Sequence, residues 1–297
     1  MLYGAASSSM VHKDLNAIFV SMTQSEKANR LLELHQGTDP LILVNCWDAA
    51  SAVIVEHAGF PALASSSAAV ANALGHADGQ YLPWPEMVSA IRRIASVVDV
   101  PVTADIEAGF SEKNQLERSI ADVITAGAVG VNLEDALPGH GEFGPLYQIS
   151  GQIARIQTAR KTGEQNGIHL VINARTDAYW QKGPTPEEAL RNTIERGQAY
   201  RQAGADCIFV PGLKNPDHIR AVVQALQSPV NILATMGAPS IPELKALGVK
   251  RVSLGSGPMR SVLGLLRKIA HEVKTAGTYS LMLKDMVPYD EMNEFFK

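Results

Sequence analysis

Two pairs of acidic residues carry the clearest chemical potential in this chain. Asp105 and Glu107 stand at the end of one apolar run, and Glu134 and Asp135 follow the next run, at 129–133. In a strand, residues two apart point to the same side, so Asp105 and Glu107 can aim two carboxylates at one spot. Either pair alone is typical of solvated charge at a loop. Two pairs at matching strand ends indicate a divalent cation held by oxygen ligands.

A cation follows a third apolar run. Arg175 comes directly after residues 171–174, and a guanidinium facing carboxylates is suited to a substrate carboxylate or phosphonate, which it binds through two parallel hydrogen bonds. The alternative is a structural ion pair with Asp177 or Glu134.

Three further groups give weaker signals. The run 65–67 contains three serines, whose backbone N–H groups can bind an anion or can form an ordinary polar turn. Asp78 stands in a loop, where a carboxylate by itself is more typical of a turn. His140 lies between Gly139 and Gly141, in a glycine-rich segment typical of a mobile lid, although a lone loop histidine is usually solvated.

The positions of these groups depend on the elements between them. The expected strands are 41–45, 62–65, 100–106, 129–133, 170–173, 207–210, 230–233 and 251–254. The expected helices are 25–35, 85–98, 115–126, 151–164, 186–203, 217–226, 241–247 and 259–276. One short pattern occurs four times, at Gly59, Gly127, Gly204 and Gly248. In each case a helix ends, a glycine can adopt the left-handed backbone conformation, and a strand follows.

Eight strands in about 250 residues favour a fold of the α/β class, a closed (β/α)₈ TIM-type barrel. A doubly wound open sheet is the alternative, weakened because no Gly-x-Gly-x-x-Gly follows the first strand. In such a barrel the chemistry lies at the carboxyl ends of the strands, where the acidic pairs and Arg175 fall. The opposite ends carry few acidic residues, and this asymmetry indicates an enzyme.

Composition limits the remaining choices. Residues 1–21 show no clear periodicity and receive no role, and 22–297 are expected to form one barrel domain with a C-terminal helical extension. The net charge of −4 with scattered basic residues argues against nucleic acid as a partner. No apolar run approaches the roughly 20 residues that span a membrane, and the start lacks a signal-peptide pattern. Cys46 and Cys207 lie in apolar stretches and are expected to be buried thiols, so we expect a cytoplasmic protein.

These motifs, taken together, resemble those of the isocitrate lyase/phosphoenolpyruvate mutase superfamily over residues 41–276. The shared elements, in chain order, are Ser65-Ser66-Ser67, Gly75 to Asp78, Asp105-Ile106-Glu107-Ala108-Gly109-Phe110, Gly130 to Asp135, and Asn173-Ala174-Arg175-Thr176-Asp177.

The resemblance implies a barrel whose last helix is swapped between subunits, in a homodimer or homotetramer. It also implies Mg²⁺, with Mn²⁺ as an alternative, held by Asp105, while Glu107, Glu134 and Asp78 reach the ion largely through water. Arg175 would grip one end of a small carboxylic acid substrate. Its carboxylate would bind backbone amides near Ser66, Ser67 and Ala68. Family substrates are 2-oxo or 2-hydroxy acids that react through an enolate.

One segment departs from the family. Lyases of this type carry a Lys-Lys/Arg-Cys-Gly-His lid, whereas residues 137–141 read Leu-Pro-Gly-His-Gly; the Lys and Asn of phosphonomutase lids are missing too. His140 is therefore the only lid group able to act as an acid or a base. The second catalytic candidate, Arg175, lies outside the lid.

The sequence predicts a Mg²⁺-dependent lyase that cleaves a C–C bond of a small 2-oxo or 2-hydroxy (di)carboxylic acid through a metal-stabilised enolate. Its reaction would resemble that of an oxaloacetate decarboxylase or a methylisocitrate lyase. The alternatives are a phosphonopyruvate/phosphoenolpyruvate C–P bond enzyme and a non-catalytic barrel that binds a small acid.

Overall fold

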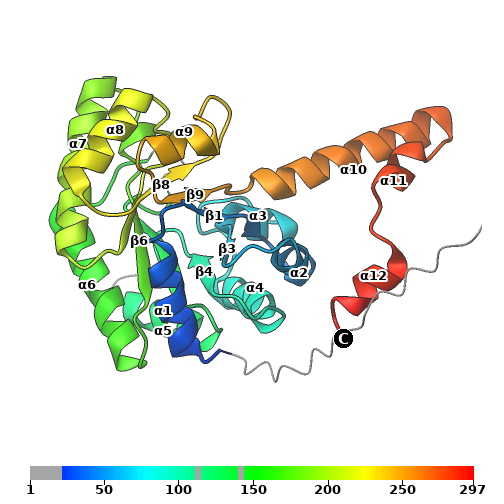
Figure 1. Cartoon of the computed structure of the whole chain (residues 1–297), viewed down its shortest axis with the longest axis horizontal. Helices are drawn as coiled ribbons and strands as arrows, with labels where there is room; N and C mark the ends of the chain where they lie inside the picture. Colours follow the sequence, from blue (N-terminus) through cyan, green and yellow to red (C-terminus); the bar gives the residue numbers. More distant parts are fainter. Residues whose placement is uncertain (1–21, 111–114, 140–143) are drawn as a thin grey trace, which may run out of the picture.

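The computed structural model describes residues 22–110, 115–139 and 144–297. Its centre is one parallel sheet with the strand order β1-β9-β8-β7-β6-β5-β4-β3-β2 (Figure 1). The strands are β1 Leu41–Leu43, β2 Asn45–Cys46, β3 Leu63–Ser65, β4 Val102–Asp105, β5 Gly130–Glu134, β6 Val171–Arg175, β7 Cys207–Phe209, β8 Val230–Leu233 and β9 Arg251–Ser253.

The first two strands are pieces of one strand. Only Val44 separates β1 from β2, and β1 pairs with β9 while β2 pairs with β3. The two edges of the sheet therefore meet along this segment. The result is a nearly closed barrel of eight strand positions, which confirms the expected (β/α)₈ architecture and excludes the open doubly wound sheet.

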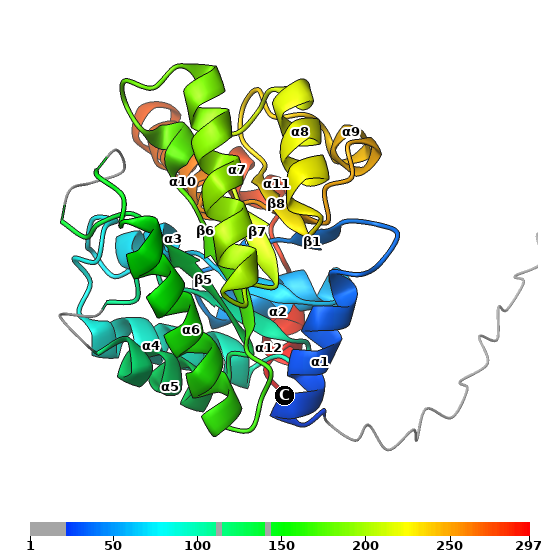
Figure 2. The same ribbon diagram turned by 90° about the vertical axis from the view of Figure 1, so that its left-hand side faces the viewer.

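Helices alternate with the strands and cover the outside of the barrel; Figure 2 shows α5, α6 and α7 side by side on that surface. The helices are α1 Gln24–Leu34, α2 Ala49–His57, α3 Ser67–Ala73, α4 Trp84–Ser96, α5 Leu116–Thr125, α6 Ile149–Gln165, α7 Pro186–Gln202, α8 Pro216–Leu226, α9 Ile241–Ala246, α10 Gly257–Ala276, α11 Ser280–Lys284 and α12 Tyr289–Glu294, with a short 3₁₀ turn η1 at Ala178–Trp180. Of the described helices, none is long and apolar enough to cross a membrane.

The four junction glycines all adopt the left-handed conformation expected of them. Their φ angles are 86° at Gly59, 102° at Gly127, 107° at Gly204 and 87° at Gly248. A residue with a Cβ atom reaches this region only at a cost, so glycine allows each helix to end and the next strand to begin within a few residues. These short returns lie at the amino ends of the strands and leave the longer loops at the carboxyl ends.

The C-terminal helix α10 projects away from its own barrel (Figure 1). Several of its large apolar side chains are exposed, among them Val262, Leu263, Leu265 and Leu266. After α11, the chain returns to the barrel at α12, where the Phe295 ring lies 4.4 Å from the imidazole of His57.

His35, directly after α1, gives the fold a specific sensitivity to acid. Burial and the nearby Arg251 lower the pKa of His35 from 6.5 to about 4, and its Nδ1–H donates to the Leu31 carbonyl at 2.7 Å. Below pH 6.5 the unfolded chain binds a proton that the folded chain does not, so this histidine makes the free energy of unfolding fall as the pH drops from 6.5 towards 4.

We therefore expect His35→Gln to flatten the pH dependence of stability in that window. Urea unfolding of both proteins between pH 7 and pH 4 measures the difference, and the carboxylates shared by the two proteins cancel. Parallel curves for the two proteins would show that His35 is not buried as a neutral group.

Candidate active site

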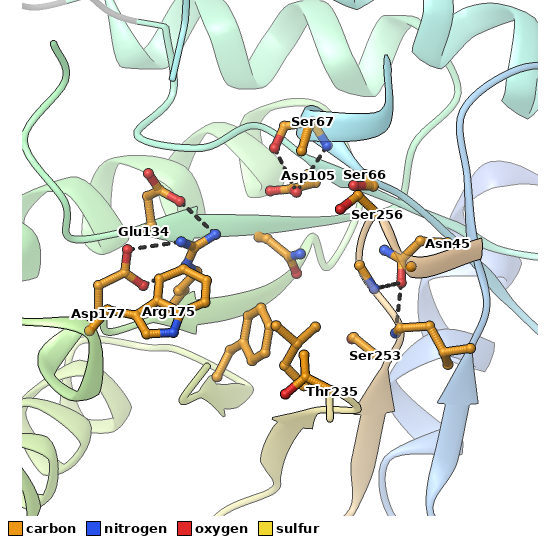
Figure 3. A pocket seen from close by; sticks show the side chains of 18 of the residues that line it. Asn45, Ser66, Ser67, Asp105, Glu134, Arg175, Asp177, Thr235, Ser253 and Ser256 are labelled. Atoms are coloured by element: carbon orange, nitrogen blue, oxygen red, sulfur yellow. Dashed lines mark hydrogen bonds and ion pairs between the residues drawn. The ribbon is translucent and has the colours of Figure 1, made fainter. Parts of the chain in front are cut away.

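A cavity of about 1130 Å³ opens at the carboxyl ends of the strands. It brings together almost every residue that the sequence selected: Ser66, Ser67, Ala68, Asp78, Asp105, Glu107, Glu134 and Arg175 all line it. Figure 3 shows the side chains of Ser67, Asp105, Glu134 and Arg175 gathered on one side of this cavity. His140 lies outside the described residues, so its predicted role in the lid stays a prediction.

Asp105 is held in a fixed orientation at the end of β4. Its Oδ2 accepts hydrogen bonds from the Ser67 backbone N–H at 3.0 Å and the Ser67 hydroxyl at 2.9 Å. The Asp105 backbone N–H donates in turn to the Ser65 hydroxyl at 2.9 Å. One carboxylate oxygen thus fixes the side chain, while Oδ1 has only a long 3.5 Å contact with the Glu107 N–H.

Glu107 reaches the cavity by a route that the sequence did not predict. β4 ends at Asp105, so the alternation of strand side chains does not apply to Glu107, and that argument was wrong. Instead, Glu107 adopts a left-handed backbone with φ of 49°, an unusual conformation for a residue with a side chain. Burial first, and then the nearby carboxylates of Asp78 and Asp105, raise the pKa of Glu107 to about 8.

Arg175 lies between two carboxylates. Its Nε and Nη2 donate to the two carboxylate oxygens of Asp177 at 2.6 and 2.8 Å, and its Nη1 lies 2.9 Å from Glu134 Oε2. Both ion pairs weighed from the sequence are therefore present. A guanidinium has five N–H donors, and these contacts engage three of them. Burial raises the pKa of Glu134 well above its ordinary value, although Arg175 opposes this shift.

Asp135 is structural, in contrast to its neighbour Glu134. Its side chain is fully buried and accepts hydrogen bonds from Arg196 at 3.1 Å and from the Tyr200 hydroxyl at 2.8 Å. Its other oxygen accepts the Asp177 backbone N–H at 3.0 Å. The two acidic residues at the end of β5 thus have different roles, because only Glu134 lines the cavity. Asp135 instead anchors Asp177, which holds Arg175.

Fewer backbone N–H groups after β3 are available to bind an anion than the sequence suggested. The Ser66 N–H donates to the Cys46 carbonyl at 3.2 Å, and the Ser67 N–H is used by Asp105. Ala68, in the first turn of α3, is the remaining amide of the three. Asn45 is a lining residue to which the sequence assigned no role: its Oδ1 accepts the N–H groups of Leu254 and Gly255 and joins β2 to the end of β9.

The charges of the cavity fit a hydrated divalent cation. Five carboxylates line it: Asp78, Asp105, Glu107, Glu134 and Asp177. The lining cations among the described residues are Arg175, Lys214 and Arg260, and the last two are exposed. Burial first, and then the neighbouring carboxylates, raise the pKa values of Glu107 and Glu134, and a bound cation would oppose both effects.

The described side chains do not by themselves complete the coordination of a metal ion. Within 22–110, 115–139 and 144–297, no three His, Cys, Asp or Glu side chains are placed to bind one ion directly. Mg²⁺ keeps several of its waters and needs only one or two carboxylates, whereas a structural Zn²⁺ site needs four direct ligands. Asp105 would hold such an ion, and its acidic neighbours would bind the ion's waters.

Comparisons with known proteins agree on one family. The family model for phosphoenolpyruvate phosphomutase matches residues 31–274. The structure of a putative phosphonomutase from Burkholderia cenocepacia J2315 is similar, with a TM-score of 0.78, 39% identity, and coverage of 83% of this chain and 99% of that one. An uncharacterised protein of Mycobacterium tuberculosis is 31% identical over 87% of this chain and 92% of its own length. The 2-methylisocitrate lyase of Aeropyrum pernix is 28% identical over 84% of this chain and 80% of its own length.

Proposed function

The chain belongs to the phosphoenolpyruvate phosphomutase family, within the isocitrate lyase/phosphoenolpyruvate mutase superfamily, and we propose that it is a Mg²⁺-dependent lyase that cleaves a C–C bond of a small 2-oxo or 2-hydroxy (di)carboxylic acid. The observation that carries this proposal is the group of five carboxylates around Asp105, with Arg175 beside them, at the mouth of the barrel. When bound there, Mg²⁺ supplies Lewis-acid stabilisation of the negative charge that develops on a substrate oxygen.

The residues of the chain bind and orient the acid. Arg175 keeps two N–H donors beyond those used by Asp177 and Glu134, and these would bind a substrate carboxylate. The Ala68 N–H would supply a further donor on the Asp105 side. Ser67 contributes indirectly, because its two hydrogen bonds fix the orientation of Asp105.

Decarboxylation of an oxaloacetate-like acid requires the fewest protein groups. The C3–C4 bond breaks, C4 leaves as CO₂, the bonding electrons pass to the enolate of C2 and C3, and water protonates C3. A retro-aldol cleavage of a 2-hydroxy acid, as in a methylisocitrate-lyase-like reaction, needs both a base and an acid from the protein. We therefore favour decarboxylation.

A C–P bond reaction of phosphonopyruvate or phosphoenolpyruvate is the second candidate. It is favoured by the 39% identity to a putative phosphonomutase. Against it, Arg175 is already shared between two carboxylates, which leaves little positive charge for a phosphonate dianion.

A steady-state assay with Mg²⁺ separates these functions. Oxaloacetate, a 2-hydroxy tricarboxylate and phosphonopyruvate are each offered to the protein, and pyruvate, glyoxylate, phosphate and phosphoenolpyruvate are measured. We expect C–C cleavage of the first acid. Turnover of phosphonopyruvate alone, either to phosphoenolpyruvate or to pyruvate and phosphate, would establish the C–P reaction, and binding of the acids without any product would indicate a non-catalytic barrel.

His140 distinguishes the two C–C reactions. We expect His140→Ala to keep most of the kcat, because water protonates the enolate and the surrounding segment lacks the cysteine acid of the family. Only bulky replacements that hinder closure of residues 137–145 should be harmful. A large loss of kcat with an altered pH profile near neutrality would instead identify a retro-aldol lyase in which His140 moves a proton.

We further propose that α10 packs against a second copy of the chain, in a homodimer or homotetramer. The exposed side chains of Val262, Leu263, Leu265 and Leu266 lie on a helix that projects from its own barrel (Figure 1). An exposed apolar helix of this length is costly in water unless a partner covers it.

Light scattering after size exclusion tests this expectation. The full chain should elute as a dimer or tetramer, and Leu266→Lys should shift it towards the monomer. The matched exposed variant Leu74→Lys, on the barrel, should leave the assembly unchanged. A wild-type monomer at micromolar concentration would contradict helix exchange.

A further inference from the structure

A guanidinium is completely buried inside the barrel, beneath the cavity. Arg251 lies on β9, two residues before the lining residue Ser253, and its side chain has no exposed surface. Burial lowers the pKa of Arg251 to about 10, so the group stays protonated at neutral pH and can only donate hydrogen bonds. Its Nε and Nη1 have no partner among the described residues, and its Nη2 donates to Asn132 Oδ1 at 3.1 Å.

This hydrogen bond determines how the Asn132 side chain is turned. A side-chain amide has an oxygen that accepts and a nitrogen that donates, and only the oxygen can face a guanidinium. Asn173, paired in register with Asn132, donates from Nδ2 to the same oxygen at 2.6 Å. The Asn173 Oδ1 is then left without a partner in the described chain. Arg251 therefore fixes the orientation of both amides.

The nitrogen of the Asn132 amide is left to face the cavity. Asn132 lines the cavity, although only 4% of its surface is exposed. Its two hydrogen bonds with described residues both end on Oδ1, and its Nδ2 is not among the fully enclosed atoms that lack a partner. The floor of the cavity thus presents an N–H donor whose direction is set from below.

Asn132 lies between the two groups that are expected to hold the acid. Its strand β5 runs between β4, which ends at Asp105, and β6, which ends at Arg175 (Figure 3). Asn132 is paired in register with Asp105 and stands two residues before Glu134 on β5. Residues two apart in a strand share a face, so Asn132 lies one layer deeper than Glu134 on the same face. An acid that reaches from Asp105 to Arg175 passes over Asn132.

We infer that Arg251 is a positioning residue that directs the Nδ2–H of Asn132 towards the acid, where it donates to the oxygen on C2. This inference rests on the proposed lyase function, in which Arg175 and Ala68 bind the carboxylate and the C2 oxygen lies near Asp105. During C–C cleavage the bonding electrons pass to the enolate, so negative charge grows on that oxygen. A donor that is oriented in advance stabilises this charge without reorganisation.

Removal of the donor is the first test. Asn132→Ala should lower kcat for oxaloacetate by roughly 100-fold and change KM far less, because the donor acts on charge that develops in the transition state. The matched control Asn231→Ala removes a buried amide that donates to Ser253 and does not line the cavity, so it should keep the kcat of the wild type. A loss confined to KM in Asn132→Ala, or no loss at all, would overturn the inference.

A double-mutant cycle tests the role of Arg251. Arg251→Met fills a similar volume without a donor, and it should lower kcat by roughly tenfold because the Asn132 amide is then free to turn. In the Asn132→Ala background the same change should have no further effect on kcat. Arg251→Lys, which keeps a donor, should recover part of the loss. Equal losses in both backgrounds, without recovery by lysine, would show that Arg251 only supports the fold.

A binding measurement separates this inference from the proposed reaction. Oxalate is a planar dianion that cannot undergo the cleavage, and one of its oxygens takes the place of the enolate oxygen. In calorimetric titration of the Mg²⁺-loaded proteins, oxalate should bind Asn132→Ala roughly tenfold more weakly than wild type, and Asn231→Ala as tightly as wild type. If this difference is found but no acid is cleaved, only the proposed reaction fails. Equal affinities of wild type and Asn132→Ala, or no binding to either, would overturn the inference.

Discussion

Asp105→Ala should abolish the Mg²⁺-dependent activity, with a loss on the order of 10³-fold or more in kcat, because several kcal/mol of charge stabilisation depend on the ion that Asp105 holds. The fold should survive the change. The side-chain oxygens of Asp105 accept hydrogen bonds from Ser67 and, at longer range, from the Glu107 N–H, and they form no ion pair with another described residue.

Calorimetric titration with Mg²⁺ is the direct readout of this prediction. The wild-type protein should bind the ion and the Asp105→Ala protein should not, while both melt at similar temperatures. Asp217→Ala removes an exposed carboxylate that does not line the cavity and serves as the matched control. Undiminished Mg²⁺ affinity in the Asp105→Ala protein would show that the ion is bound elsewhere.

Arg175→Lys should lower kcat/KM by about 2–4 kcal/mol, which is a loss of roughly 30-fold to 1000-fold, because an ammonium cannot reproduce the planar fork of a guanidinium. The geometry strengthens this expectation. Arg175 must hold Asp177 with two donors, Glu134 with a third and the substrate with the remaining two. Lysine has three donors on a single nitrogen and cannot meet all of these demands.

If Arg175 had only a structural role, its substitution would lower the stability of the protein without a separate loss in kcat/KM. Asp177→Asn weakens the same ion pair without removing the guanidinium, so it provides a matched control for stability. We expect both variants to lower the melting temperature, and Arg175→Lys to add a loss in kcat/KM beyond that of Asp177→Asn. Near-normal kinetics of Arg175→Lys would show that Arg175 supports the barrel without contacting the substrate.

The barrel itself was largely predictable because its periodic signals are local. Each of the eight apolar runs became a strand, and the four junction glycines turned left-handed where the helix ends required it. Helix α2 was predicted only through its end before Gly59, and its bounds were not, since Ala49–His57 is apolar on most sides and contains Val53, Ile54 and Val55. β-branched residues in succession are typical of strands, whereas the Asp48 cap and tertiary packing favour the helix here.

The candidate site was predictable in its members but not in their contacts. Neighbouring residues of a strand point to opposite faces, and this rule could have separated Glu134 from Asp135 in advance. The partners of Asp135, Arg196 and Tyr200, lie four residues apart on α7, more than sixty residues along the chain. No local pattern links them to Asp135. Their role follows only from the way α7 packs against the barrel.

The most direct test of the proposed function is the rate of C–C cleavage in protein first freed of metal by a chelator and then titrated with Mg²⁺. Formation of pyruvate and CO₂ from oxaloacetate, and of a 2-oxo acid from a 2-hydroxy tricarboxylate, would be followed at each Mg²⁺ concentration. The account predicts no cleavage above the uncatalysed rate without Mg²⁺, restored cleavage when it is added, and no restoration in Asp105→Ala. Cleavage that persists at full rate in the chelated protein, or that never appears with any of these acids, would contradict it.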